Sequence, residues 1–473
     1  MVRKIKTTLW ACAAIVAAAG ASAETLTDTL VSAYNNSNLL EQSRAVLRAS
    51  DEDVAIAVSA LRPIFAYSAS RAYSWDLDTD VIQTTTGPQR EDDTSITNTL
   101  ELTAQMSLYE FGRNRLGVEA AKEAVLAARQ ALLAQEQDVL FAAVQAYTQV
   151  RQAQAFVDLR RNNVRVLEEE LRAANDRFDV GEVTRTDVAQ AEAYLAEAQA
   201  SLVAANGDLE IAREAFRLAV GRYPGDLAPP PSFSSRPSSL ETARDVAVRT
   251  HPSIRQQQFL VSAQEVNVDI AQRQVLPSLR ATGSAGYSDS VSSSNDGSLE
   301  PVASLGIEFG GPIYQGGQIN ALYRRAVTVL EQNRASLLQT TLNVQERVGY
   351  AWANFQVAIA SLEATERQIE ASQVAFEGTR EEATLGARTT LDVLNAEQDL
   401  LDARGSRIEA LTVEQDAYYF LLSTMGQLTA KDLGLDVVAY DENAYYDNVR
   451  AAPSVFTSEQ GVKLDKVLRA LGK

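Results

Sequence analysis

The side chains that most often carry out chemistry are scarce in this chain. Its 473 residues contain one histidine, His251, and one cysteine, Cys12. His251 stands beside Pro252 where a helix is expected to begin, which favours a helix-end residue over a general base or a metal ligand. A single histidine leaves no imidazole for a Ser-His-Asp set, and a single cysteine allows neither an internal disulfide nor a thiolate metal cluster.

Other candidate motifs also lack their essential partners. The glycine pairs Gly310-Gly311 and Gly316-Gly317 are not followed by the Lys-Ser/Thr of a phosphate-binding loop. The acidic run Glu168-Glu169-Glu170 falls on a segment that we expect to be a solvated helix, so it is interpreted as surface charge. We therefore expect no enzyme, no catalytic residue, no metal site and no cofactor.

The first residues have the pattern of a secretory signal peptide. Arg3, Lys4 and Lys6 precede an apolar run over residues 9–20, and small residues at 21–23 supply a cleavage site. The run is too short to anchor the chain in a bilayer. A lipoprotein signal around Cys12 is the rival interpretation, but bulky Trp10 stands where such a signal holds a small residue.

The formal net charge of the chain is −19. Because binding to phosphates calls for a basic surface, nucleic acid is excluded as an expected partner. The acidity is consistent with solubility and also with a negative lumen, and charge alone does not decide between them.

The most informative feature is an internal repeat with an offset of 205 residues. The offset carries Tyr109-Glu110-Phe111-Gly112 onto Tyr314-Gln315-Gly316-Gly317. It also pairs Gly181 with Gly386, Thr184 with Thr389, Asp187-Val188 with Asp392-Val393, Ala191-Glu192 with Ala396-Glu397, Leu195 with Leu400 and Gly221 with Gly426. One offset that holds over more than a hundred residues indicates a duplicated structural unit.

The middle of each copy has the spacing of a long helix. Residues 113–179 contain no proline and one glycine, and small or apolar residues recur at alternating steps of four and three, as in a coiled-coil seam. The seam positions are Ala121, Val125, Ala128, Leu132, Val139, Ala142, Ala146, Ala153 and Phe156, with Gln135 and Gln149 as polar exceptions. At about 1.5 Å of rise per residue this helix would be roughly 100 Å long.

Each long helix is expected to turn at a glycine and return. Gly181 accepts the positive φ that ends a helix, and Thr184 or Thr186 can cap the returning helix. Gly386 plays the same part in the second copy.

Two additional helices, over residues 26–61 and 240–276, supply the length that the return helices lack. Pro63 and Pro277 close them, because proline cannot continue the helical hydrogen-bond ladder.

Four shorter segments change from a helical period to a strict alternation of polar and apolar side chains. They cover residues 67–75, 100–108, 279–287 and 303–309. Each approaches the ten residues that a tilted membrane strand needs, with aromatic side chains toward the ends. The connectors 76–93 and 288–300 are polar and are expected to be exposed loops.

The number of strands bears on the assembly. Hairpins of a soluble sheet show the same alternation, but four strands of an exported chain cannot close a barrel, and open edges are not tolerated in lipid. Several copies must then contribute to one barrel, and a trimer would supply twelve strands.

These features divide the chain into five parts. We expect a signal peptide at 1–23, a first repeat at 24–220 with a β-hairpin at about 64–109 and a turn at 181, a Pro/Ser-rich linker at 221–239, a second repeat at 240–430 with a β-hairpin at about 278–314 and a turn at 386, and a tail at 431–473. The tail departs from the repeat, and whether it wraps the helices or is partly disordered stays open. We expect a short amphipathic helix in it from about Lys463.

Several motifs together resemble the TolC family of outer-membrane efflux proteins. They are Gly311-Pro312-Ile313-Tyr314-Gln315-Gly316-Gly317-Gln318, Arg177-Phe178-Asp179-Val180-Gly181 and the run from Leu385 to Ala396. The likeness covers nearly all of the mature chain up to about Leu433.

The resemblance implies a fold that is mainly α with a membrane β-barrel part. Each protomer of a homotrimer would contribute four strands to a twelve-stranded barrel in the bacterial outer membrane, and a coiled-coil helical barrel would extend into the periplasm. It implies docking to a periplasmic membrane-fusion adaptor and to an inner-membrane pump of the resistance-nodulation-division or ABC type.

The resemblance also assigns roles to residues near the two turns. Val180, Gly181 and Glu182, with Leu385, Gly386 and Ala387, match the turns that bind the adaptor. Asp392 matches the pore constriction, where Asn395 stands at a position that can hold a second acid.

Asp187 and Arg388 match positions of polar links that hold the entrance shut, although Ala383 stands where a linking tyrosine can occur. Replacing either residue by alanine is expected to raise single-channel conductance.

The predicted function is passive exit of drugs, small molecules or secreted proteins through a tripartite efflux or type I secretion system. The alternative is a periplasmic coiled-coil scaffold or adaptor without a membrane barrel, which would explain the helices but not the hairpins placed identically in both repeats.

Overall fold

The computed structural model describes residues 23–75, 81–85, 87–90, 94–231, 233, 237–291 and 297–451. The predicted signal peptide lies outside the described residues except for its last residue, and so does the amphipathic helix expected from Lys463. The chain forms two compact units. Unit 1 comprises Met1–Arg44, Ala131–Ile254 and Thr340–Tyr440, and unit 2 comprises Ala45–Gln130, Arg255–Gln339 and Asp441–Lys473.

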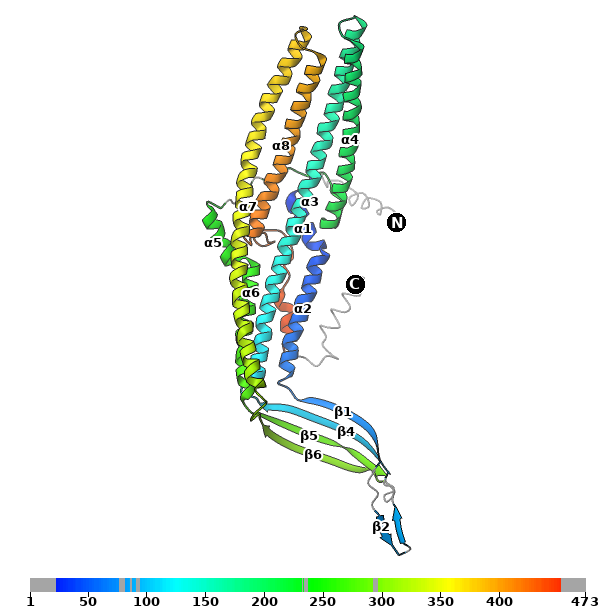
Figure 1. The fold of residues 1–473 in the computed structure, drawn as a ribbon, viewed down its shortest axis with the longest axis vertical. Helices are drawn as coiled ribbons and strands as arrows, with labels where there is room; N and C mark the ends of the chain where they lie inside the picture. Colours follow the sequence, from blue (N-terminus) through cyan, green and yellow to red (C-terminus); the bar gives the residue numbers. More distant parts are fainter. Residues whose placement is uncertain are drawn as a thin grey trace, which may run out of the picture. The chain divides into compact units, whose positions relative to one another are not determined.

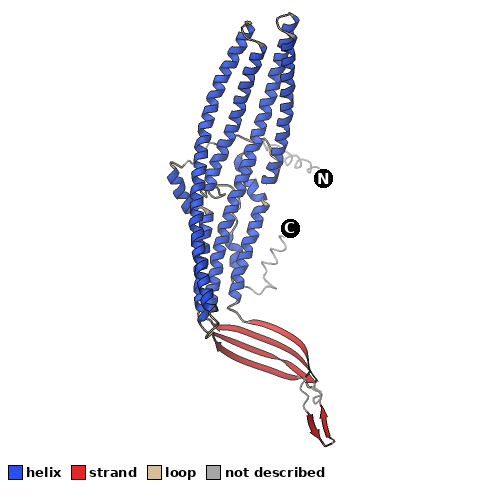
Figure 2. Ribbon diagram, viewed as in Figure 1, coloured by secondary structure: helices blue, strands red, loops and turns tan. Residues whose placement is uncertain are grey.

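Helices make up most of the described chain (Figures 1 and 2). They are α1 (Leu26–Asn36), α2 (Asn38–Ser59), α3 (Arg113–Asp179), α4 (Arg185–Val220), α5 (Leu240–Thr250), α6 (Pro252–Gln272), the 3-10 turn η1 (Arg273–Val275), α7 (Gln318–Thr384), α8 (Thr390–Thr424) and α9 (Glu442–Val449). The strands are β1 (Ile64–Trp75), β2 (Val81–Thr84), β3 (Gly87–Arg90), β4 (Thr94–Tyr109), β5 (Ser278–Val291) and β6 (Glu300–Gly310).

The long helices confirm the sequence prediction. α3 spans residues 113–179 as expected, and its counterpart α7 has the same length of 67 residues. The return helix α4 begins after Thr184, which is its N-cap, and ends at Gly221 with φ of 86°. Duplicated sequence therefore gives duplicated helical hairpins.

The two additional helices differ from the prediction because each is divided in two. Ser37 interrupts the first, and its hydroxyl accepts a hydrogen bond from the Leu40 backbone N–H at 3.2 Å, which starts a new helix. Pro252 interrupts the second, since it lacks the N–H that a continuing helix needs and is accepted at a first helical position.

The predicted seam of α3 is half right. The positions Val125, Leu132, Val139, Ala146 and Ala153 are buried as expected. The other row is displaced by one residue, since Ala142 is exposed while Ala143, Val150 and Val157 are buried. The second buried row thus lies four residues after the first, and not three as predicted. Gln135 and Gln149 therefore fall outside the buried stripe.

The core of unit 1 is built from large side chains of the four long helices. Tyr147, Phe216, Phe355, Leu394 and Leu421 are almost completely buried. Phe355 and Tyr418 also pack with Phe233 of the linker after α4. This packing holds the helical hairpins together within the unit.

Unit 2 contains a four-stranded antiparallel sheet in the order β1-β4-β5-β6 (Figure 1). Its register gathers the apolar side chains on one face. One row across all four strands is Tyr67, Leu102, Ala285 and Ala303, and a row on the opposite face is Ser70, Thr99, Ser288 and Glu300. The alternation predicted for each strand therefore adds up to one apolar and one polar face.

The connector at 76–93 was predicted to be a loop, and this is wrong in part. β2 and β3 pair antiparallel within it, with Thr84 opposite Gly87. The φ of Gly87 is 116°, a conformation that favours glycine, so a tight reversal is available at this position.

The described part of the tail packs on the helices. Within unit 2, the Tyr445 hydroxyl of α9 donates a hydrogen bond to Glu52 of α2 at 2.6 Å. The Arg129 guanidinium of α3 donates to the Glu442 carbonyl at 3.2 Å. Within the tail, α9 therefore packs against α2 and α3.

Among the residues that the structure describes, every helix falls short of the combined length and apolarity needed to cross a bilayer.

Candidate functional site

The turn between α3 and α4 is closed by two backbone hydrogen bonds. The Gly181 N–H donates to the Phe178 carbonyl, and the Glu182 N–H donates to the Arg177 carbonyl, both at 2.9 Å. This pattern ends a helix when the glycine takes a left-handed conformation, and the φ of Gly181 is 82°.

The turn between α7 and α8 repeats this geometry at the offset of 205 residues. The Gly386 N–H donates to the Ala383 carbonyl at 3.1 Å, and the Ala387 N–H donates to the Glu382 carbonyl at 2.9 Å. The φ of Gly386 is 76°. Both turns belong to unit 1 and lie at the same end of its long helices (Figure 1).

The surface of both turns is open and apolar at its tip. A Cβ atom added to Gly181 or Gly386 would meet nothing within 4 Å, so the glycines are required by conformation and not by space. Val180 is 72% exposed and Leu385 is 84% exposed. Each turn thus presents one apolar side chain and an accessible backbone.

Asp187 forms the start of α4. Its Oδ2 accepts hydrogen bonds from the backbone N–H and the hydroxyl of Thr184, both at 2.8 Å, while the Thr184 hydroxyl accepts from the Asp187 N–H at 3.3 Å. This reciprocal arrangement is a capping box. The hydrogen bonds from Thr184 hold the pKa of Asp187 below its usual value, and the bond from the backbone N–H has the larger effect.

Asp392 forms the same capping box at the start of α8. Its Oδ2 accepts from the Thr389 N–H at 3.0 Å and from the Thr389 hydroxyl at 2.8 Å. These bonds lower the pKa of Asp392, and the bond from the backbone N–H has the larger effect. The carboxylate predicted for the pore constriction is therefore held in its charged form.

The predicted lock residues are engaged separately within the protomer. The Arg388 guanidinium contacts the Glu382 carboxylate, with Nε 2.9 Å from Oε2, across the turn of its own hairpin. Asp187 is occupied by Thr184. A link from Arg388 to Asp187 is absent from the described residues of one chain, so the lock stays a prediction.

Asn395 joins the two helical hairpins. Its Oδ1 accepts a hydrogen bond from the Tyr194 hydroxyl of α4 at 3.2 Å. The residue that replaces a second acid at the predicted constriction is thus already bonded to the neighbouring return helix.

One partly buried acid and one buried acid nearby were not expected from the sequence. Glu170 was interpreted as surface charge, but its side chain is 12% exposed and lies 3.5 Å from Arg380 of α7. Glu397 of α8 is 6% exposed. The spacing of Val393, Glu397 and Leu400 on one helical face is the signal that could have found it.

His251 is a helix-end residue, as predicted. Its backbone N–H donates to the Ala247 carbonyl at 2.9 Å at the end of α5, and its Nδ1 accepts from the Ser253 N–H at 3.2 Å. Burial, with a smaller effect of the Arg347 charge, lowers the pKa of His251 to about 4. The imidazole is therefore neutral near pH 7.

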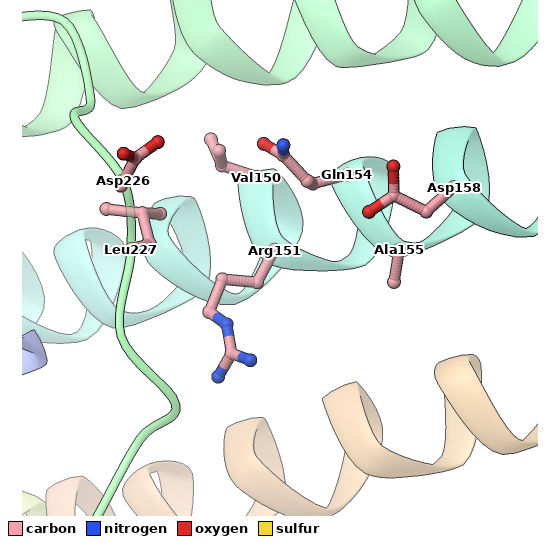
Figure 3. A pocket seen from close by; sticks show the side chains of 7 residues that line it. All are labelled: Val150, Arg151, Gln154, Ala155, Asp158, Asp226 and Leu227. Atoms are coloured by element: carbon pink, nitrogen blue, oxygen red, sulfur yellow. The ribbon is translucent and has the colours of Figure 1, made fainter. Parts of the chain in front are cut away.

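A hollow of about 250 Å³ lies beside α3 in unit 1 (Figure 3). It is lined by Val150, Arg151, Gln154, Ala155, Asp158, Asp226 and Leu227. These residues come from α3 and from the segment after α4, and none of them is among the predicted site residues. We assign no role to this hollow.

Comparison with known proteins agrees with these features. The family model described as outer membrane efflux protein matches residues 29–222 and 244–427, one segment in each predicted repeat. The outer membrane efflux protein BepC of Brucella suis biovar 1 (strain 1330) is 36% identical over 432 residues, which cover 91% of this chain and 91% of BepC.

Two further likenesses extend this result. The alkaline protease secretion protein AprF of Pseudomonas aeruginosa is 29% identical over 391 residues, covering 80% of each chain. The crystal structure of the CmeC outer membrane channel of Campylobacter jejuni shares the fold, with a TM-score of 0.71 and 19% identity over 91% of this chain and 90% of CmeC.

Duplicated helical hairpins joined to a sheet with one apolar face define a channel protein of the outer membrane. The chain belongs to the outer membrane efflux protein family, which confirms the resemblance to TolC. Members of this family are transport channels and not enzymes.

Proposed function

We propose that the chain is one protomer of a homotrimeric exit duct that docks with a periplasmic adaptor and an inner-membrane pump. The duct gives passive passage to molecules that the pump delivers. The pump is of the resistance-nodulation-division or ABC type.

The apolar face of the open sheet carries this proposal. Tyr67, Leu102 and Leu305 on that face are 82%, 64% and 90% exposed in the single chain. Such side chains are stable against lipid, but β1 and β6 remain the edges of the described sheet. Since lipid does not tolerate open edges, β1 of one copy pairs with β6 of the next until the barrel closes. Three copies give twelve strands.

The two turns support the docking role. An apolar tip beside an accessible glycine backbone suits a partner hairpin that approaches closely. In this proposal Val180, Gly181 and Glu182, together with Leu385, Gly386 and Ala387, bind the adaptor.

The alternative of a periplasmic scaffold leaves the apolar face unexplained. A water-exposed sheet with such a face would be an aggregation site. Lipid around the sheet removes this difficulty.

The substrate is the finer part of the proposal. BepC is named for efflux and AprF for secretion of alkaline protease. The greater identity to BepC favours efflux of drugs or other small molecules over secretion of proteins.

A deletion strain tests docking and substrate together. The wild-type gene should restore drug resistance, and the double variant Val180→Asp with Leu385→Asp should not, because charged tips cannot pack against an apolar partner surface. The matched control is Leu299→Asp, a 69% exposed leucine in the loop before β6. It should restore resistance fully.

The outcomes separate the parts of the proposal. If the double variant reaches the outer membrane in normal amount and still restores resistance, docking through the tips is wrong. If the deletion abolishes secreted proteins and leaves drug resistance unchanged, the chain serves secretion instead of efflux.

A further inference from the structure

Glu397 interrupts the apolar stripe that packs α8 inside unit 1. Val393, Leu394 and Leu400 on the same face are 4%, 1% and 3% exposed. Glu397 is 6% exposed among them. Burying a carboxylate in this way is costly unless hydrogen bonds or cations compensate it.

Compensation is only partial. Oε1 of Glu397 accepts a hydrogen bond from Asn163 Nδ2 of α3 at 3.2 Å. Oε2 is buried and has no hydrogen-bond partner among the described residues. The carboxyl group borders a cavity of about 160 Å³ between α3, α7 and α8, which is large enough for several water molecules.

The charged groups around Glu397 are occupied elsewhere. On α3 and α7, Glu170 and Arg380 form an ion pair at 3.5 Å. On α8, Arg404 donates from Nη2 to Oε1 of Gln373 at 2.8 Å. These three charges act on Glu397 only at a distance, and the nearby Tyr194 of α4 bonds to Asn395.

The first repeat provides an internal comparison. Glu192 occupies the position equivalent to Glu397 at the offset of 205 residues, and it is exposed. A glutamate at this repeat position is therefore buried in α8 and not in α4. The burial therefore depends on what packs against α8 at this position, which includes α3 through Asn163 and α7 through the shared cavity.

We propose that Glu397 is a proton-binding site that sets how firmly α8 packs on α3. When the carboxyl group is neutral, its burial costs little and the two helices pack closely. When it loses the proton, an unpaired negative oxygen remains in the apolar stripe and weakens the contact. The ligand is the proton itself, which reaches the carboxyl group through the adjoining cavity.

The titration falls near neutral pH. Burial raises the pKa of Glu397 to about 7, although the hydrogen bond from Asn163 opposes the shift. A raised carboxyl pKa means that the folded state binds the proton more tightly than the unfolded state. Stability of the contact is thus greatest at acid pH, falls as pH rises toward 7, and stays low above it.

Hydrogen exchange of the purified full-length protein tests this site. The amide exchange rate of residues 390–404 is measured in the wild type and in Glu397→Gln. The ratio of the two rates at each pH removes the intrinsic pH dependence of amide exchange, which is the same in both proteins. From about pH 5.5 to about pH 8.5 the ratio of wild type to variant should rise on the order of tenfold. The matched control Glu192→Gln, referred to the wild type, should give a ratio that does not change with pH.

A second variant keeps the test informative if Glu397→Gln does not fold. Asn163→Ala removes the hydrogen bond that favours the charged form, so exchange of residues 390–404 in this variant should change with pH around a higher midpoint than in the wild type. A merely structural role would alter the rate without moving the midpoint. A ratio that is constant across the pH range, or an unmoved midpoint in Asn163→Ala, would overturn the proposal.

Discussion

At the scale of single residues, Asp187 has a structural role in addition to the gating role predicted for it. Its carboxylate accepts two hydrogen bonds from Thr184, the N-cap of α4, and alanine at this position would remove both bonds along with the charge. A variant that keeps the acceptor is therefore needed to isolate the lock.

Asp187→Asn and Arg388→Ala should both raise single-channel conductance if the polar lock holds the entrance. Asparagine retains an oxygen that accepts from Thr184, so α4 starts normally while the charge is lost. Arg388→Ala removes an ion pair that is 53% and 55% exposed, which contributes little to stability. Conductance of the reconstituted protein in planar bilayers is the measurement.

The control is Arg367→Ala, which removes a still more exposed pair with Glu363, 72% and 71% exposed, on α7 away from the turn. Conductance should stay at the wild-type level in this variant. If Asp187→Asn and Arg388→Ala behave like the control, these two residues do not form the lock.

The sequence located these residues through the repeat but indicated only some of their contacts. Asp187 and Asp392 stand three residues after a threonine, a spacing that predicts the capping boxes observed. The partner of Arg388 depends on how the turn folds. The burial of Glu397 depends on which helices pack against α8, because the equivalent Glu192 of α4 is exposed.

At the scale of elements, the two turns depend on glycine for conformation. Gly386→Ala would place a Cβ at a φ of 76° and cost about 1–2 kcal/mol. Opening of the turn should become about 5–30-fold more frequent. The rate of limited proteolysis between α7 and α8 measures this change, and Gly181→Ala should act alike between α3 and α4.

Gly378→Ala is the matched control within the same hairpin. Gly378 lies inside α7, and its added Cβ would meet nothing within 4 Å. Alanine has the higher helix propensity, so this variant should not speed cleavage. Equal cleavage rates in Gly378→Ala and Gly386→Ala would show that the left-handed conformation does not limit the turn.

Long elements were predictable because composition and glycine positions specify them. The 67 residues of α3 lack proline, and the helix ends two residues before Gly181. The breaks at Ser37 and Pro252 depend on single local contacts, and the second row of the α3 seam depends on which helices pack against it. A heptad pattern does not specify these tertiary contacts.

At the scale of the whole molecule, the open sheet explains why several chains must assemble. Four strands with one apolar face were predicted from alternation, and the register that aligns Tyr67, Leu102, Ala285 and Ala303 appears only in the structure. The free edges at β1 and β6 then require further copies of the chain. Membership of the family identifies the class of channel. The open edges explain why one chain is insufficient to form a closed barrel.

Cross-linking of β1 to β6 tests this claim most directly. The only cysteine, Cys12, lies in the predicted signal peptide, so the mature chain carries no thiol of its own. Ser70→Cys on β1 and Ser304→Cys on β6, combined in one chain and treated with a short thiol cross-linker in outer membranes, should give species of two and three chains and none larger. Each single variant should remain at one chain on a denaturing gel. Single chains only, or a ladder that continues beyond three, would contradict the account.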